Sequence, residues 1–271
     1  MVAPKSASTV IFLREDRTDG FNVLMLKRNV ALEFVGGAHV FPGGKLEEND
    51  KNPELYRRCR GIDDAEASSL LDIGKDGLSY YIAAVRESFE EAGVFLGAVT
   101  GGRQALDFAA LSQARKQLNE GQVSFWEIVR ELDLEIFCDD LIYFAHWITP
   151  EGSPRRFNTR FFISSFPCDQ VVDADYGEST SLVWISPKQA VERHSRGEFE
   201  MILPTVKNLE LLSEFSSVKE VLDWASQRRD IPAITPKLVD LNGKVEVLLP
   251  DHPLYESSVE LFLQDARDLP T

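Results

Sequence analysis

The first part of the chain alternates between short apolar runs and segments rich in turn residues. STVIFLR (residues 8–14) and NVLMLK (residues 22–27) have the composition of strands, and the EDRTDGF between them predicts a hairpin. A Gly-rich stretch then encloses a short strand around residues 39–41, followed by a predicted tight turn at residues 42–44. The polar segment from residue 50 to about 77 contains helix-like pieces, PELYRRCRG and DAEASSLLD, which is typical of an insertion on the surface.

A helical pattern follows this polar segment. Ile82, Val85, Phe89 and Ala92 recur at spacings of three and four, which predicts an amphipathic helix with one apolar face. Gly93 comes next, and glycine is common just past the end of a helix.

The rest of the chain mixes strands and helices. Residues 103–135 have helical patterns, and PKQAVERHSRG predicts another helix. Strands are predicted in LIYFAHWITP, TRFFISSF and SLVWIS. Two further helices are predicted at residues 205–215 and 217–228, and a hairpin around Asn242-Gly243. The expected fold class is therefore α/β or α+β, with a mixed sheet and flanking helices.

Composition and charge narrow the possible functions. The chain has 271 residues, 44% of them hydrophobic, which suits one sizeable domain with insertions. A net charge of −15 repels nucleic acid, so no nucleic-acid partner is expected. The three cysteines form no CxxC pair, which indicates neither a disulfide framework nor a zinc site and favours a reducing cytoplasm. The N-terminal apolar run is too short for a signal sequence or a membrane span.

Three glutamates in the predicted helix raise the first question of chemistry. Glu87, Glu90 and Glu91 stand at i, i+3 and i+4 and so share one face. Like charges at these spacings cost only about 0.2–0.5 kcal/mol per pair in an isolated helix. A solvated acidic face is one interpretation. Convergence on a hard cation such as Mg²⁺ or Mn²⁺ is the other, and the helix alone leaves both open.

Two segments taken together resemble the sequence motif of a known protein family. FPGGKLE (residues 41–47) and RESFEEAGV (residues 86–94) resemble the Nudix box, G-x5-E-x7-R-E-U-x-E-E-x-G-U, where U is aliphatic. Ser88 stands where an aliphatic residue is usual. Counted from Gly44, the early acidic position is Asp50, which lies 36 positions before the arginine instead of 8, so about 28 residues are inserted. The matching positions are Arg86, Glu87, Glu90, Glu91, Gly93 and Val94.

The split box points to a subgroup of Nudix proteins. With GAHVFPGG, WITPEGSPRRFNTRFF and LLPDHPLY, it resembles the "motif 19" group, which includes coenzyme A diphosphohydrolases. The resemblance covers roughly residues 8–256. It implies a Nudix α/β/α sandwich forming a single domain, residues 1–271. Insertions are expected at about 51–77 and 103–135, and a helical C-terminal extension from about residue 204.

The resemblance also implies an activity and a set of site residues. The activity is metal-dependent cleavage of a diphosphate linkage in a nucleoside diphosphate joined to another group, with Mg²⁺ or Mn²⁺ as cofactor. The implied metal ligands are Glu87, Glu90, Glu91 and the carbonyl of Gly44, and Arg86 is expected to hold a box carboxylate in place. Which carboxylate takes the proton from the attacking water stays open.

Two further acids are candidates. Asp50 could replace the early glutamate, although it is one methylene shorter and lies before the insertion. Glu178 precedes a predicted strand where relatives often carry an acidic loop residue, and it could be an additional ligand or base. A solvated loop glutamate is the alternative for Glu178.

A basic cluster stands out in so acidic a chain. Arg155, Arg156 and Arg160 could bind an outer phosphate, such as the 3′-phosphate of coenzyme A, because guanidinium forks match phosphate. Salt bridges to the many carboxylates are the alternative. Arg28, at the end of the second strand, is a candidate for the same role, whereas His39 is expected to be packed.

The substrate is less closely defined than the reaction. Coenzyme A-specific Nudix enzymes often carry L-L-T-x-R-[SA]-x3-R-x3-G-x3-F-P-G-G, which Leu24, Arg28 and Gly37 fit, but Glu33 replaces the second arginine. Coenzyme A and its acyl esters are therefore candidates beside ADP-ribose, NADH and nucleotide sugars. A different class of function is a Nudix-fold ligand sensor or interaction module, with the insertions as a partner or homodimer surface. The intact set of three glutamates argues against it.

Overall fold

The computed structural model describes residues 2–18, 20–29, 36–102, 105–174 and 179–263. Its centre is a mixed sheet with the strand order β10-β2-β1-β9-β8-β11, in which β3 also pairs with β2 and β4 with β1. The strands are β1 (Lys5–Asp16), β2 (Gly20–Arg28), β3 (His39–Val40), β4 (Gly43–Lys45), β8 (Ile142–Ile148), β9 (Phe157–Ser165), β10 (Ser179–Ile185) and β11 (Ala233–Ile234). The predicted hairpin of β1 and β2 is confirmed, and β1 pairs in parallel with β9.

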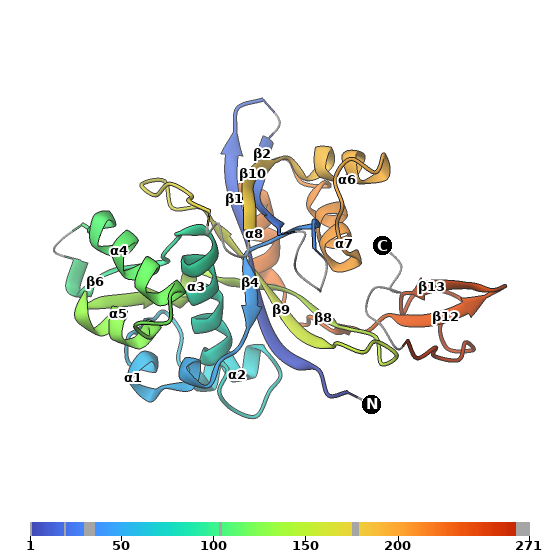
Figure 1. The fold of residues 1–271 in the computed structure, drawn as a ribbon, viewed down its shortest axis with the longest axis horizontal. Coiled ribbons are helices and arrows are strands. Elements are labelled where there is room, and N and C mark those ends of the chain that lie inside the picture. The colour runs from blue at the N-terminus through green and yellow to red at the C-terminus, as the bar shows by residue number, and fades with distance from the viewer. Residues whose placement is uncertain (1, 19, 30–35, 103–104, 175–178, 264–271) are drawn as a thin grey trace.

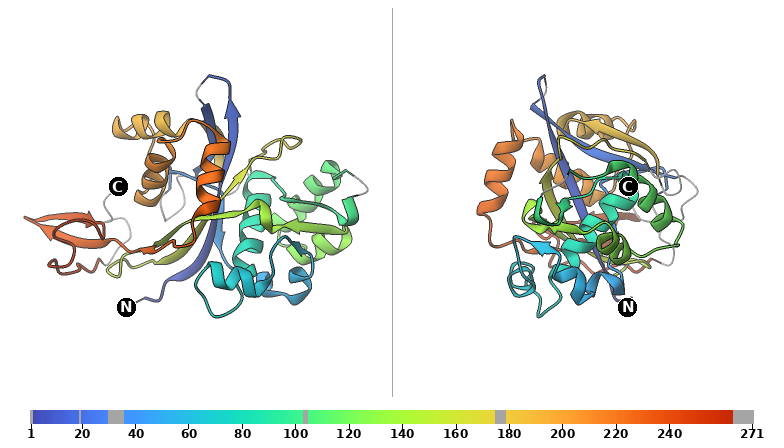
Figure 2. Two further views of the ribbon diagram at one scale, coloured as in Figure 1. Left: turned by 180° about the vertical axis from the view of Figure 1, so that it is seen from behind. Right: turned by 90° about the vertical axis from the view of Figure 1, so that its left-hand side faces the viewer.

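Helices cover both faces of this sheet. One face carries α3 (Leu78–Ala92) with α1 (Pro53–Tyr56), α2 (Asp64–Leu70), α4 (Phe108–Asn119) and α5 (Phe125–Glu131) (Figure 1). The other face carries α6 (Pro187–Ser195), α7 (Leu203–Leu212) and α8 (Val218–Gln227) (Figure 2). The period-two alternation of β1 explains this arrangement, because Val10 and Phe12 are buried in the first core and Ile11 and Leu13 in the second. The expected α/β/α sandwich is confirmed.

The polar segment after Asp50 is more deeply buried than its composition indicated. Leu55, Ala67 and Leu71 are almost fully buried in the same core as α3. PELYRRCRG forms a helix only over Pro53–Tyr56 and then enters a strand, β5 (Cys59–Arg60). The surface expectation was therefore wrong for these apolar positions, since each has a core to pack against.

The two segments predicted to be insertions each contribute to a second, three-stranded sheet. Its order is β5-β7-β6, where β6 is Gly97–Val99 and β7 is Leu134–Phe137. The helical pattern of residues 103–135 is confirmed by α4 and α5, but it gave no sign of β7. The strand β7 is short, and it alternates a fully buried Leu134 and Ile136 with half-buried neighbours.

Of the predicted tight turn at Pro42-Gly43-Gly44, only the bend at Pro42 is present, and the prediction is wrong for the two glycines. Gly43 and Gly44 lie in β4, paired antiparallel with Thr9 and Ser8 of β1. A Cβ at Gly43 would stand 2.6 Å from the Cα of Thr9, so glycine is required here by the close approach of two backbones.

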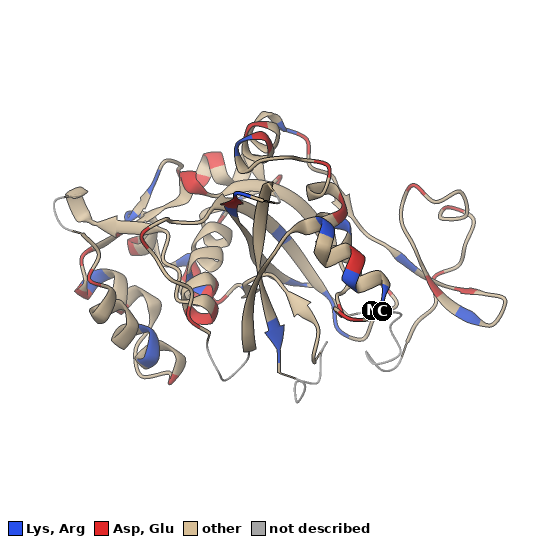
Figure 3. Cartoon of the chain, turned by 90° about the horizontal axis from the view of Figure 1, so that it is seen from above, with Lys and Arg blue, Asp and Glu red and all other residues tan. Residues whose placement is uncertain are grey.

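The C-terminal part begins with α7 and α8 at the predicted places and ends in a projecting hairpin (Figure 1). Its strands are β12 (Lys237–Leu241) and β13 (Lys244–Leu248), joined by Asn242 and Gly243 with φ of 58° and 82°. Both angles suit the two-residue turn that the sequence predicted. Within the described ranges, no helix is long and apolar enough to cross a membrane. Acidic and basic residues are scattered over helices and loops on both sides of the sheet (Figure 3).

Candidate active site

The acidic turn lies at the C-terminal end of α3. Val85 and Phe89 anchor the helix in the core with 0% and 1% exposure, which turns the opposite face toward β4. The helix stops at Gly93, whose φ of 70° lets its N–H bond to the carbonyl of Phe89. Ser88, the departure from the aliphatic pattern, donates its hydroxyl to the carbonyl of Ala84 at 2.7 Å, so it is satisfied inside the helix.

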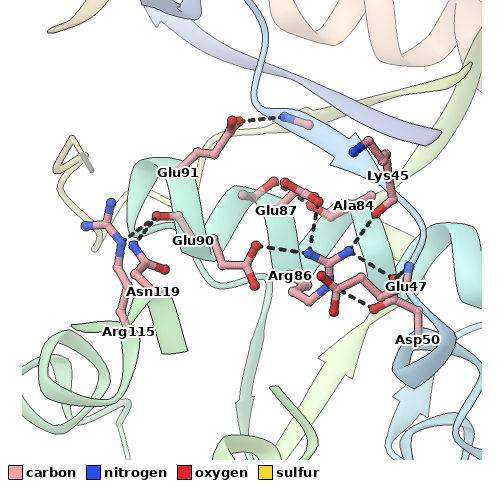
Figure 4. Close-up of polar contacts among 12 residues, drawn as sticks. Lys45, Glu47, Asp50, Ala84, Arg86, Glu87, Glu90, Glu91, Arg115 and Asn119 are labelled. Carbon is pink, nitrogen blue, oxygen red and sulfur yellow. Dashed lines mark hydrogen bonds and ion pairs between the residues drawn. The ribbon is translucent and has the colours of Figure 1, made fainter. Parts of the chain in front are cut away.

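Arg86 is the centre of the site (Figure 4). Its Nε and Nη2 form a fork on Asp50, at 2.9 Å to Oδ1 and 3.0 Å to Oδ2. Nη2 also donates to the carbonyl of Lys45 at 2.8 Å. Nη1 donates to Glu87 Oε1 and to Glu90 Oε2, both at 2.9 Å. A guanidinium has five N–H groups, so these five contacts leave none for another ligand.

Charge and burial act together in this cluster. Burial alone would lower the pKa of the Arg86 guanidinium, but the ion pair with Asp50 outweighs it and raises that pKa, so the group stays charged. Burial raises the pKa of Glu90 to about 7, against the opposing effect of Arg86, and the neighbouring charge of Glu87 adds to the rise. Arg86 thus supplies the positive charge that lets these carboxylates lie side by side.

Asp50 reaches Arg86 although 36 positions separate them. It lies in a 3₁₀ turn over Glu48–Lys51, where its Oδ2 accepts from the N–H of Glu47 at 2.7 Å. Its exposure is 1%. Of the two extra acids that the sequence offered, the structure brings Asp50 into the cluster as the partner of Arg86. Glu178 lies outside the described residues.

The glycine pair of β4 contacts the other carboxylates. Glu91 Oε2 accepts from the N–H of Gly43 at 2.8 Å, and Glu91 is 7% exposed. The carboxylate of Glu87 lies against the Cα of Gly44, where an added Cβ would stand 2.5 Å from Glu87 Oε1. Glu87 and Glu91, one helical turn apart, therefore contact the successive residues Gly44 and Gly43 of β4.

The fit of these residues to a metal ion can be tested on this geometry. No group of three or more His, Cys, Asp or Glu side chains in the described part of the chain is gathered as a metal ion requires. The reason is visible in the contacts, since Glu87 and Glu90 are held by Arg86 and Glu91 by Gly43. The donor chemistry does fit, because carboxylates and backbone carbonyls are the ligands that Mg²⁺ and Mn²⁺ prefer, and the missing Cβ of Gly44 leaves room beside Glu87.

The second insertion is bonded directly to the acidic turn. Arg115 Nε and Asn119 Nδ2, both on α4, donate to the carbonyl of Glu90 at 3.0 Å and 3.1 Å. Arg115 is 7% exposed and also bonds the carbonyl and the carboxylate of Asp173. Arg115 was missed in the sequence, where nothing distinguishes it from the other arginines on helical segments.

The structure does not gather Arg156 and Arg160 at the acidic turn. Arg156 is 8% exposed and donates to the carbonyls of Thr149 and Val2. Arg160 is 3% exposed, bonds the Leu71 carbonyl and lies 4.8 Å from the ring centroid of Tyr80. Tyr80 precedes Glu87, the first of the three glutamates on α3, by seven residues, roughly 10 Å along the helix.

The other two candidate arginines differ in their surroundings. Arg155 is exposed on the loop that precedes β9. Arg28 is the last residue of β2, which pairs with β3, and β3 leads into β4. Within the described part of the chain, the buried Nε of Arg28 has no hydrogen-bond partner. The expectation that His39 is packed is confirmed: its ring stacks on Phe199 with centroids 3.5 Å apart, and burial lowers its pKa to about 4.

The fold and the Arg86 cluster together define a protein of the Nudix hydrolase class. Similarity to a solved structure supports the fold: a Nudix hydrolase from Alicyclobacillus acidocaldarius superposes with a TM-score of 0.65 at 22% identity. The match covers 82% of this chain and 97% of that one. More narrowly, the family model described as the NUDT19 Nudix domain matches residues 61–212, more than half of the chain. The chain belongs to this family.

Curated relatives agree with this assignment. The putative nudix hydrolase 7 of Caenorhabditis elegans is 29% identical over 202 residues, which cover 74% of this chain. The human acyl-coenzyme A diphosphatase NUDT19 is 27% identical over 298 residues, which cover 93% of this chain. The chain spans 57% of the length of the nematode protein and 75% of the human one.

Proposed function

We propose that this protein is a divalent-metal-dependent hydrolase that cleaves the diphosphate linkage of coenzyme A or acyl-coenzyme A. The Arg86 cluster is the observation that carries the proposal, because it holds three carboxylates beside a glycine strand at the box positions. Nudix hydrolases generally use divalent metal ions. Support for the substrate comes from the relatives named as acyl-coenzyme A diphosphatases in human, chicken and frog.

Each side chain of the cluster has a distinct proposed role. Glu87, Glu90, Glu91 and the Gly44 carbonyl would hold Mg²⁺ or Mn²⁺, which when bound neutralises diphosphate charge and lowers the pKa of a water. Arg86 orients Glu87 and Glu90, and it does not bind phosphate because every N–H is already used. The N–H of Gly43 fixes the direction of the Glu91 carboxylate.

The substrate phosphates need cations outside this cluster. Arg28 is the proposed contact, because its strand adjoins the one leading into β4 and its buried Nε has no partner within the described residues. Arg155 stays a prediction. Arg156 has no geometric support as a phosphate ligand, because backbone carbonyls accept from its Nε and Nη1. Arg160 also has a buried Nε without a partner in the described residues, but its Nη groups bond Asn158 and the Leu71 carbonyl and its guanidinium lies over the ring of Tyr80.

Further properties accompany this proposal. A reducing cytoplasm is proposed because Cys59, Cys138 and Cys168 are free thiols. The excess of 44 acidic over 29 basic residues supports a small-molecule partner and no nucleic acid. A homodimer and the single-domain organisation stay predictions, which light scattering and limited proteolysis would check.

The test is a substrate panel with a matched pair of variants. Purified protein with Mn²⁺ or Mg²⁺ is incubated with coenzyme A, acetyl-coenzyme A, ADP-ribose, NADH and a nucleotide sugar, and products are identified by mass. We expect 3′,5′-ADP and 4′-phosphopantetheine from coenzyme A, and a loss of at least about 100-fold in Glu91→Gln or after chelation. Glu131→Gln, on the exposed surface of α5, serves as the control that keeps activity.

Other outcomes of the panel are equally informative. Cleavage of ADP-ribose, NADH or a nucleotide sugar alone would keep the site and reject coenzyme A. Absence of turnover of every substrate, with specific binding of one of them, would indicate a ligand sensor instead of an enzyme.

A further inference from the structure

A cavity of about 390 Å³ lies on the side of the Arg86 cluster that faces the second insertion. This volume is within the range of small-molecule sites in proteins. Its lining includes Arg86 and Glu90 of α3, Asp50, and Leu55 of α1. The end of α4, the start of α5 and the connection between them supply further lining residues from Leu118 to Glu127. Residues of both predicted insertions line the cavity, which shares three side chains with the candidate active site, those of Asp50, Arg86 and Glu90.

The charges around this cavity disfavour the phosphate-bearing end of the proposed substrate. Four carboxylates line it, Glu47, Asp50, Glu90 and Glu127, and Arg86 is the one cation among its lining residues. Arg86 has no N–H left to donate. Glu127 stays ionised, because hydrogen bonds from the N–H and hydroxyl of Ser124 lower its pKa. Apart from a metal ion held by Glu90, a phosphate entering here would meet carboxylates and no available donor cation.

The uncharged side chains of the cavity indicate what could bind instead. Asn49 and Gln122 bring amide groups, whereas Leu118, Val123 and Phe125 bring apolar surface. A mixed lining of this kind suits a chain in which amides and hydroxyls alternate with short aliphatic segments. The α4 part of the lining is also firmly placed, since α4 is bonded to the Glu90 carbonyl through Arg115 and Asn119.

We propose that this cavity binds the uncharged, amide-bearing arm of the diphosphate substrate, while the nucleotide and its phosphates lie on the other side of the acidic turn. The inference rests on the proposed function, and it adds the direction in which the substrate lies across the site. In this proposal the two predicted insertions select substrates by the chemistry of the substrate's arm.

The first test fills the cavity and compares two substrates. Leu118→Trp places an indole in the cavity from the last turn of α4. Coenzyme A is compared with the methyl diphosphate ester of 3′-phosphoadenosine, which keeps the scissile bond and lacks the arm. We expect kcat/KM for coenzyme A to fall at least about ten-fold, mainly through KM, and the value for the methyl ester to stay within about two-fold.

Two controls guard against an effect on folding. Leu211→Trp makes the same change at a partly buried position of α7, on the opposite face of the sheet, and we expect it to leave the ratio of the two substrates unchanged. Gln122→Ala shortens an exposed lining side chain and should lower kcat/KM for coenzyme A about three-fold without affecting the methyl ester. An equal loss for both substrates in Leu118→Trp would overturn the proposal.

A binding measurement separates this inference from the proposed function. Ligand-observed NMR with pantetheine, which carries no phosphate, needs no turnover. Saturation transfer to pantetheine in the wild type and its loss in Leu118→Trp would support the arm site even if no diphosphate were cleaved. Equal transfer in both proteins, no transfer in either, or binding of spermidine with none of pantetheine would each contradict it, the last in favour of a cation site.

Discussion

Arg86 and Arg160 are both buried, with 2% and 3% exposure, but their guanidinium groups have opposite kinds of partner. Arg86 bonds three carboxylates, those of Asp50, Glu87 and Glu90. Arg160 bonds the Asn158 amide oxygen at 2.7 Å and the Leu71 carbonyl at 3.1 Å. In the described part of the chain no carboxylate lies within ion-pair distance of Arg160.

This difference separates a positioning role from a packing role. An arginine that holds ionised side chains determines where charge stands in a site, whereas one that holds backbone carbonyls determines only the path of the chain. Burial of a cation therefore does not by itself identify a functional residue. We propose that in this protein the identity of the acceptors does, and the following changes test that proposal.

The largest expected effect is that of Arg86→Gln compared with Arg160→Gln. The first change leaves the buried Asp50 carboxylate uncompensated, which should lower the free energy of unfolding by about 3–5 kcal/mol. It should also lower kcat/KM at least about 100-fold, because Glu87 and Glu90 lose their orientation. Arg160→Gln should be destabilising as well, yet keep kcat/KM per folded molecule within about three-fold.

Urea unfolding and steady-state kinetics on the folded fraction measure the two quantities separately. Arg86→Lys is the conservative control, since an ammonium keeps the charge but cannot form the fork on Asp50. The distinction fails if Arg160→Gln abolishes turnover in a protein that remains folded.

An intermediate effect is expected from Gly44→Ala. The added Cβ would stand 2.5 Å from Glu87 Oε1, the far end of a flexible side chain, so the carboxylate moves while the backbone stays. We expect a loss of about ten-fold in kcat/KM and a change in unfolding free energy below about 1 kcal/mol. Gly74→Ala is the matched control, because a Cβ there meets nothing within 4 Å. Similar kinetics for the two variants would show that Glu87 needs no defined position.

The smallest effect is expected from Asp50→Glu, which restores the residue usual at this box position. The longer side chain must fit a place with 1% exposure, so a destabilisation of about 1 kcal/mol is expected. Activity should change only a few-fold because a carboxylate still faces Arg86. Asp50→Asn, similar in size but uncharged, should be clearly worse in both assays. Equal behaviour of the two variants would mean that the charge at this position is dispensable.

Local patterns in the sequence predicted a large part of this structure. The apolar spacing of residues 82–92 and Gly93 predicted α3 and its end, and the turn chemistry of Asn242-Gly243 predicted the last hairpin. The three glutamates on one turn predicted the acidic side of the site. Each of these features depends on residues close together in the chain.

Features that depend on distant partners could not be predicted. The contact of Asp50 with Arg86 spans 36 positions, and no pattern in the insertion shows that it folds back. The strand β7 forms because Ile136 pairs with Cys59 of β5 on one side and with Gly97 of β6 on the other. Arg156 and Arg160 resemble phosphate ligands in the sequence, since nothing local shows that carbonyls of residues 2 and 71 reach them.

The small sheet β5-β7-β6 joins the two predicted insertions, and we expect them to open as one cooperative unit. β7 lies between a strand of the first insertion and β6, and Arg58 bonds Asp133 across the junction at 2.6 Å. Backbone amides in all three strands should therefore exchange with solvent in a single opening event. Deleting either insertion would leave the other with an exposed strand edge, so a shortened enzyme of this kind has to lose both together.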